Sequence, residues 1–249
     1  MAYKLGFITW IFSNFLQVSV SYYLWKAIFN SSEQGLISGF TFFDMQVYII
    51  MSFLCRMLTL FSVGQEIAYE ISDGRISTVL LKPISYVIRM IFESLGRISV
   101  MFFIIAIPTW SFMVIFRNMI YDIPSPSFSA ILMLFISLAL SFLIGFSIGL
   151  CAFFVTYIWG FLICKEAIFM LLSGAIIPLS MFSPAIHNVL QYLPFVSWNY
   201  IPIMIYMQKL EPSQILTYLA IQLFWVITLT VLLRIFWKAA IKRLSIVGG

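Results

Sequence analysis

The sequence is short of charged residues, histidine and cysteine, and each shortage excludes a class of protein. Lys, Arg, Asp and Glu together make up 9 % of the chain. A soluble domain carries roughly 25 % of these residues. Because 63 % of the residues are hydrophobic, so few charges cannot cover a water-facing surface of ordinary size. The composition therefore predicts a membrane protein.

The single histidine and the three cysteines provide no catalytic or metal-binding set. His187 has no acid–nucleophile pair near it, and Cys55, Cys151 and Cys164 fall in or beside apolar runs without a ligand spacing. No lysine is followed by Ser or Thr, so the loop Gly-x-x-x-x-Gly-Lys-Ser/Thr that binds ATP phosphates is missing. We expect no catalytic residue, no metal site, no cofactor and no enzyme activity in this chain.

Long apolar runs fill most of the sequence. About 20 helical residues cross the roughly 30 Å of hydrocarbon in a bilayer. Five long runs, and a shorter one after the charged pair Lys165-Glu166, predict six spans in one transmembrane domain, 1–249. The predicted spans are 5–29, 45–63, 98–116, 128–154, 167–181 and 215–237. The first run is too long for a signal peptide and has no cleavage site after it.

The basic residues predict the orientation, because Lys and Arg near span ends favour the cytoplasmic side. With six spans both termini lie on one side. The basic residues on that side would be Lys4, Arg75, Lys82, Arg89, Arg97, Lys165, Arg234, Lys238, Lys242 and Arg243. Those on the other side would be only Lys26, Arg117 and Lys209. We therefore expect both termini inside. A net charge of +5 fits contact with membrane lipid and requires no nucleic acid.

The most informative polar stretch follows the second predicted span, at residues 64–83. Read as a helix, it places Glu66, Glu70 and Asp73 at i, i+4 and i+7, on one face. This acidic stripe fits a surface that docks onto a soluble partner, or a solvated loop that only joins two spans. The charge pattern alone favours the loop.

The end of this stretch, Ile71-Ser-Asp-Gly-Arg-Ile-Ser-Thr-Val-Leu-Leu-Lys-Pro-Ile-Ser85, resembles the signature loop of type-2 ABC transporter permeases. The subgroup it resembles consists of short, six-span, separately encoded subunits. Its signature is an acidic helix, then Ser/Asp-Gly, then Leu-Leu-Lys/Arg-Pro. Further similar pieces are 17–29, 173–180 with 193–195, and the basic tail 237–245. The resemblance extends over nearly the whole chain, in order.

The resemblance implies an all-α permease subunit of an ABC exporter in a bacterial plasma membrane. Such a subunit forms the substrate route, faces a second permease subunit, the same or paralogous, and is driven by separate ATPase subunits that bind ATP and Mg²⁺. The loop between spans two and three would be the cytoplasmic coupling helix. The matching positions here are Glu66, Glu70, Asp73, Gly74, Arg75, Lys82 and Pro83.

The start of the chain departs from the family pattern. Family members begin with a cytoplasmic amphipathic elbow helix, whereas only Met1–Lys4 precede the first apolar run here. The elbow helix is expected either to be absent or to lie upstream.

The segment 183–212 contains prolines that divide it into pieces too short to span. Ser183-Pro184 is typical of a helix start, and we expect short helices at 184–192 and 199–209. Non-spanning backbone at this depth must be covered by protein or line a cavity. The resemblance implies outer re-entrant half-helices that cap the exit of the route, and the alternative is an interfacial aromatic belt. The cap residues would be Pro184, Pro194, Phe195, Trp198 and Pro202.

Arg56 lies within the second predicted span, about 10 Å from its inner end. An arginine there costs about 2.5–3.5 kcal/mol on insertion scales and is a functional candidate by default. The alternatives are a side chain that snorkels to the headgroups or a structural pair with Glu93 or Glu166. We favour the structural interpretation.

Small residues recur at every fourth position of the fourth span, at Ser137, Ser141, Gly145 and Gly149. Such a stripe lets another helix approach closely, and we expect this helix to belong to the same subunit. Pro108 predicts a kink in the third span.

The competing function is an ATP-independent secondary transporter or another polytopic membrane protein. Against a carrier, only the second predicted span has a charge at its centre, whereas carriers place ionisable groups near the midplane. Against an intramembrane enzyme, no acid–base or metal set falls within the spans. The aromatic, uncharged composition is compatible with an amphipathic or lipid-like substrate, but any bilayer protein shares it.

Overall fold

The computed structural model describes residues 2–32, 35–59, 63–115, 127–155 and 157–247, and these residues are mostly helical. The elements are α1 (Ala2–Asn30), β1 (Leu36–Ile37), β2 (Phe40–Thr41), α2 (Phe42–Thr59), α3 (Val63–Ser72), α4 (Ile76–Leu80), α5 (Tyr86–Met101), the π turn η1 (Phe102–Ala106), α6 (Ile107–Ile115), α8 (Phe128–Leu150), η2 (Cys151–Phe153), α9 (Trp159–Leu172), η3 (Leu179–Met181), α10 (Pro184–Leu190), η4 (Pro194–Trp198), α11 (Tyr200–Tyr206) and α12 (Pro212–Val247).

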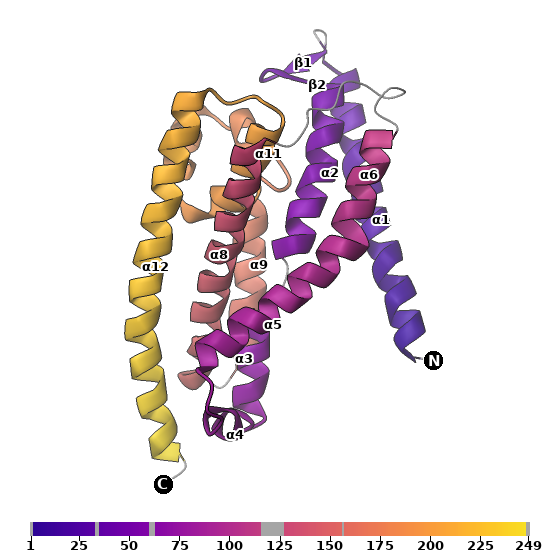
Figure 1. Cartoon of the computed structure of the whole chain (residues 1–249). Coiled ribbons are helices and arrows are strands. Elements are labelled where there is room, and N and C mark those ends of the chain that lie inside the picture. Colours follow the sequence, from indigo (N-terminus) through magenta and orange to yellow (C-terminus); the bar gives the residue numbers. More distant parts are fainter. Residues whose placement is uncertain (1, 33–34, 60–62, 116–126, 156, 248–249) are drawn as a thin grey trace.

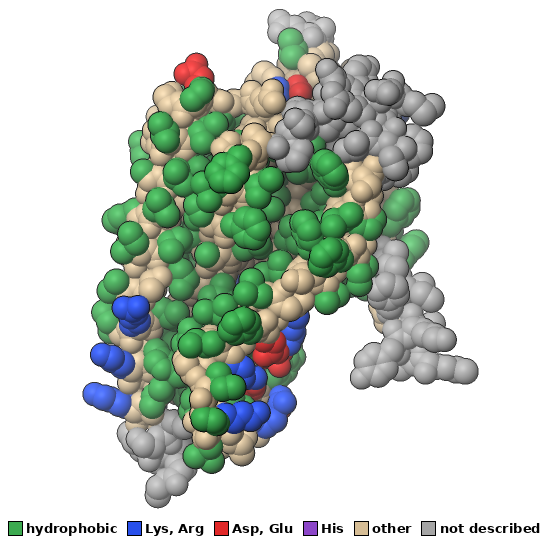
Figure 2. All heavy atoms as spheres, in the orientation of Figure 1, with side chains coloured by type: hydrophobic (Ala, Val, Ile, Leu, Met, Phe, Trp, Pro, Cys, Tyr) green, Lys and Arg blue, Asp and Glu red, His purple; other side chains and the backbone are tan. Residues whose placement is uncertain are grey.

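The long helices form a bundle with two unlike ends (Figure 1). At one end lie α3, α4 and the chain-terminal ends of α1 and α12, and we call it the basic end. The antiparallel pair β1–β2 lies at the other, called the hairpin end. Lys and Arg side chains gather at the basic end (Figure 2). Helices α3 and α4 thus lie at the same end of the bundle as these basic side chains.

Four helical stretches are long and apolar enough to cross a membrane: Phe42–Ser72, Tyr86–Ser111, Phe128–Phe153 and Pro212–Arg243. They correspond to the second, third, fourth and sixth predicted spans. The first predicted span, 5–29, lies entirely within α1, a single helix of 29 residues. It falls outside this group of four, since Asn14, Gln17 and several hydroxyl groups interrupt its apolar residues.

The fifth predicted span, 167–181, is not one helix. Helix α9 begins eight residues earlier, at Trp159, and ends at Leu172. Gly174 then adopts a φ of +79°, a left-handed conformation that ends helices, and Pro178 follows. At 14 residues, α9 is about 21 Å long, which is shorter than the hydrocarbon core. Six complete spans are therefore not shown.

The third predicted span bends before its proline, as expected. Pro108 has no N–H to donate to the carbonyl four residues earlier. The π turn Phe102–Ala106 directly precedes this position, and α5 and α6 run in different directions on its two sides (Figure 1). The helix also starts earlier than predicted, at Tyr86, so the oblique α5 extends to the basic end.

The small-residue stripe of α8 packs within the subunit, which confirms that prediction: Gly145 and Gly149 lie against α3, whereas Ser137 contacts the Ser197 oxygen of η4. A Cβ atom built on Gly64 would lie 2.5 Å from the Gly145 oxygen, and one on Gly149 would lie 2.8 Å from the Gly64 Cα. The hydroxyl of Ser141 donates to the Thr59 oxygen at 3.2 Å. Because the two backbones nearly touch, α3 is held rigidly against the bundle.

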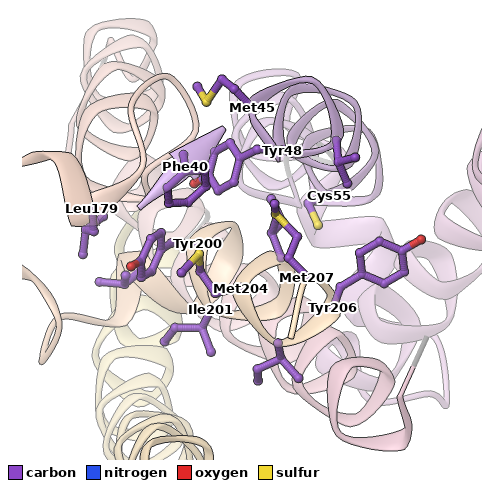
Figure 3. Close-up of a cluster of buried hydrophobic side chains, with 14 of the residues drawn as sticks. Phe40, Met45, Tyr48, Cys55, Leu179, Tyr200, Ile201, Met204, Tyr206 and Met207 are labelled. Atoms are coloured by element: carbon purple, nitrogen blue, oxygen red, sulfur yellow. The ribbon is translucent and has the colours of Figure 1, made fainter. Parts of the chain in front are cut away.

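A second buried cluster fills the hairpin end. It joins Phe40 and Tyr48, from the hairpin and α2, to Tyr200, Ile201 and Met204 of α11 (Figure 3). All seven residues of α11 are buried. This cluster fixes the segment that contains the predicted outer half-helices.

Candidate functional site

The acidic stripe of α3 contacts α5 rather than the solvent. Glu70 is 4 % exposed. Its carboxylate accepts a hydrogen bond from the Tyr86 hydroxyl at 2.7 Å and two from one Arg89 nitrogen, at 2.5 and 2.6 Å. Arginine matches a carboxylate in charge and geometry, so Glu70 is neutralised within the chain.

A second set of ion pairs connects α3 to α5 one turn away. Arg97 donates to Glu66 at 3.0 Å and to Glu93 at 2.8 Å. Glu93 also lies 3.4 Å from Arg89. Two arginines and one glutamate of α5 therefore hold two glutamates of α3 in one network.

The expectation that three carboxylates face the cytoplasm is thus wrong for Glu70, and Glu66 is paired as well. Asp73 is exposed, with Arg75 3.0 Å away. The physical reason is that α5 starts at Tyr86 and brings Arg89 and Arg97 alongside α3. The spacing of Arg89, Glu93 and Arg97 at i, i+4 and i+8 was the signal that could have indicated this.

Beyond the network, the chain forms an exposed tip, residues 72–84. Gly74 adopts a φ of +72°, a left-handed conformation that ends helices, and α4 follows at Ile76–Leu80. The buried Ile76 anchors this short helix. Gly74, Arg75, Lys82 and Pro83 are all exposed.

The tip also presents two apolar residues that the sequence analysis did not single out. Leu81 is 85 % exposed and Ile84 is 59 % exposed. They flank Lys82-Pro83. Exposed apolar side chains rimmed by polar ones mark interaction sites, so the tip combines apolar and charged contacts on a rigid support.

A second candidate site lies inside the bundle, around Arg56. The Arg56 guanidinium donates to the Gln17 side-chain oxygen on α1 at 2.5 Å. Arg56 also lines a cavity of about 50 Å³ together with Lys165 and Glu166 of α9. Lys165 pairs with Glu166 at 2.8 Å. Of the two pairing partners expected for Arg56, Glu166 shares its cavity, whereas Glu93 is held by the arginines of α5.

These contacts correct two expectations. Lys165 and Glu166 lie in the middle of α9, not in an inner loop, because the helix begins at Trp159. Charge inside the bundle is therefore not confined to the second span. The cavity is lined by two cations and one anion.

The outer segment lies directly beside this cavity. The expected short helices are present as α10, Pro184–Leu190, and α11, Tyr200–Tyr206. Trp198 stacks on Phe169 of α9 with ring centroids 3.6 Å apart, and Phe195 meets the same ring edge-on at 4.8 Å. Trp198 also lines the cavity of Arg56.

A buried hydrogen-bonded chain fixes the outer segment to α2. The Asn199 amide donates to the Ser52 hydroxyl at 2.6 Å, which donates to the Ala175 oxygen at 3.0 Å. The Tyr48 hydroxyl donates to the Gly174 oxygen at 2.6 Å. Protein thus covers this non-helical backbone, as its depth requires.

Among the described residues, no three His, Cys, Asp or Glu side chains are placed to hold a metal ion. Long apolar helices, intramembrane charges and a basic end define the class: a polytopic membrane protein.

The family follows from comparison with known proteins. The chain matches the model of the ABC-2 family transporter proteins over residues 15–248, and it belongs to this family. Neither the curated proteins nor the solved structures give a match.

Proposed function

We propose that this chain is the permease subunit of an ABC exporter, forming the substrate route and coupled to a separate ATPase subunit. Membership of the ABC-2 transporter family over nearly the whole chain supports the general class. The observation that carries the coupling proposal is the exposed tip at 72–84, which extends from α3. Helix α3 is in turn held by ion pairs to α5 and by close glycine packing to α8.

In this proposal the tip docks onto the ATPase, with Leu81 and Ile84 as apolar contacts and Asp73, Arg75 and Lys82 as polar ones. Glu66 and Glu70 transmit force rather than touch the partner. Because α3 is fixed to both α5 and α8, a push on the tip moves these helices together. ATP and Mg²⁺ bind in the ATPase, and this chain supplies no catalytic residue, cofactor or metal ligand.

The substrate route would run along the face formed by α1, α2 and α9, opposite a second permease subunit that is the same or paralogous. Gln17, Arg56, Lys165 and Glu166 lie on these helices, beside Phe195 and Trp198 of the outer segment, which would cap the exit. The location would be a bacterial plasma membrane, with the basic end in the cytoplasm.

Co-expression with an ABC ATPase of the same organism, followed by co-purification, tests the proposal. The variant Leu81→Glu with Arg75→Glu places repulsive charge on the tip without touching the network of Glu70. We expect it to insert normally and to lose the ATPase. Glu211→Lys, an exposed charge change at the hairpin end, should keep it. Retention of the ATPase by the tip variant would refute the docking surface.

A secondary transporter is the second candidate, because Arg56 and the buried side chain of Lys165 place ionisable groups beside a cavity in the bundle, as carriers do. Proteoliposomes that contain this chain alone separate the two functions. Substrate movement driven by an ion gradient without ATPase would support the carrier, and movement only with ATPase and ATP would support the permease.

A further inference from the structure

A large apolar groove lies between α5, α8 and α12. Its volume is about 990 Å³, at the upper end of the roughly 300–1,000 Å³ typical of ligand sites. Along α8 it extends from Ile131 to Leu143, or about 18 Å. This length exceeds half of the roughly 30 Å hydrocarbon core, so the groove covers the depth of one leaflet.

The walls of the groove offer almost no free polar group. The hydroxyls of Ser94, Ser99 and Thr230 each donate to a main-chain oxygen four residues earlier, at 2.6–2.7 Å. The remaining wall residues are mostly Ile, Leu, Val and Phe. Phe103 and Phe135 stay about two-thirds exposed, so the groove opens sideways, where a bilayer would surround the protein.

The charged group that lines the groove is Arg234, on α12. It lies toward the basic end, beside Trp237, whose ring stacks on Tyr86 with centroids 5.2 Å apart. No described Asp or Glu lies within ion-pairing distance of Arg234. Lys238 follows one turn further along and is exposed. Figure 2 shows apolar side chains between α12 and α5, with basic side chains at their lower end.

We infer that this groove binds one anionic phospholipid from the leaflet at the basic end. Its phosphate pairs with Arg234, and its acyl chains lie along α5 and α8. Basic pockets between spanning helices on the cytoplasmic side are suited to anionic headgroups. The inference does not depend on the ATPase, because it follows from the charge and shape of the groove.

The charge distribution distinguishes a lipid from a second protein copy as the occupant. An apolar wall that ends at one cation without a carboxylate partner is complementary to an amphiphile with one anionic end. A second copy of this chain would have to supply a carboxylate at this depth, and the chain has only 9 Asp and Glu in total. Six of the described carboxylates, Asp44, Glu66, Glu70, Asp73, Glu93 and Glu166, are paired within the subunit.

Native mass spectrometry of the purified protein, titrated with phosphatidylglycerol or phosphatidylcholine, tests the inference. We expect one phosphatidylglycerol per chain, bound more tightly than phosphatidylcholine. Arg234→Gln should weaken phosphatidylglycerol about fivefold, as expected for one basic residue at a lipid surface, and leave phosphatidylcholine unchanged. Ala139→Phe, at an exposed wall position on α8, should weaken both lipids by filling the groove.

The matched control is Arg243→Gln, which removes the same charge from the same helix about 13 Å further along. Arg243 packs on the Phe154 ring, outside the groove, and its loss should leave lipid affinity unchanged. Equal weakening by both arginine variants would overturn the site, because it would indicate a diffuse surface charge.

Two further outcomes would overturn the inference. One is unchanged binding in Ala139→Phe with an unaltered thermal midpoint. The other is an intermolecular disulfide from Phe135→Cys in a chain without Cys151 and Cys164, which would show a second copy over the groove.

Discussion

The network at the basic end and the cluster around Arg56 both place charge inside the protein, but they balance it differently. At the basic end, Glu70 and Glu66 each meet an arginine of α5, and Tyr86 adds a hydrogen bond. Around Arg56, one cavity is lined by two cations, Arg56 and Lys165, and by the single carboxylate of Glu166, which pairs with Lys165. The balanced network suits a structural connection, whereas the excess positive charge suits interaction with a passing anionic group.

The largest expected effect breaks the balanced network. Glu70→Ala leaves Arg89 without its main partner. Breaking a buried ion pair costs about 3–5 kcal/mol, and we expect the lower end of this range because Arg89 is partly exposed. The thermal midpoint in detergent should fall clearly. The control is Asp73→Ala, which removes an exposed ion pair worth about 0–1 kcal/mol. Equal losses of stability in the two variants would contradict the claim that burial makes the Glu70 pair the more important one.

A comparable loss should follow Trp198→Ala in the outer segment. Trp198 stacks on Phe169, and truncation of a packed aromatic costs about 3–5 kcal/mol. If the segment also caps the route, complexes that remain folded should hydrolyse ATP while exporting less substrate. Phe195→Ala should act in the same direction more weakly. The control is Tyr192→Ala, which truncates an exposed side chain. Unchanged export in Trp198→Ala would refute the proposal that this segment caps the route.

A smaller effect is expected where α3 meets α8. Gly149→Ala places a methyl group 2.8 Å from the Gly64 Cα, and overpacking of this kind costs about 1–3 kcal/mol. Gly160→Ala is a matched control, because nothing lies within 4 Å of its added Cβ. The first variant should lower the thermal midpoint and the second should not. The opposite order would show that the two helices are not in close contact.

The smallest stability effect belongs to the cluster with excess charge. Arg56→Gln loses no carboxylate partner within ion-pairing distance among the described residues, so we expect a change below about 1 kcal/mol. We expect export of an anionic amphiphile to fall severalfold relative to ATP hydrolysis, with both rates measured on the same reconstituted complexes. A large loss of stability with normal export would show that Arg56 has a structural role, which is the interpretation favoured from the sequence.

The sequence was sufficient for features that depend on local chemistry. Pro184 begins α10, and the third span bends just before Pro108, because each outcome depends on backbone sterics within a few residues. It was not sufficient for contacts between distant segments. Glu70 looked like part of a solvated stripe until α5 brought Arg89 beside it. Lys165 looked like a loop residue because hydropathy cannot place the start of a short, partly polar helix such as α9.

The most direct test of the central claim is a photo-crosslinking amino acid at Leu81, compared with the same label at Leu36. Both side chains are exposed, one on the tip and one on the hairpin. We predict that the label at Leu81 captures a soluble ATPase subunit in intact cells and that the label at Leu36 does not. Capture from Leu36 alone, or from neither position while the complex co-purifies, would contradict both the orientation and the coupling role of the tip.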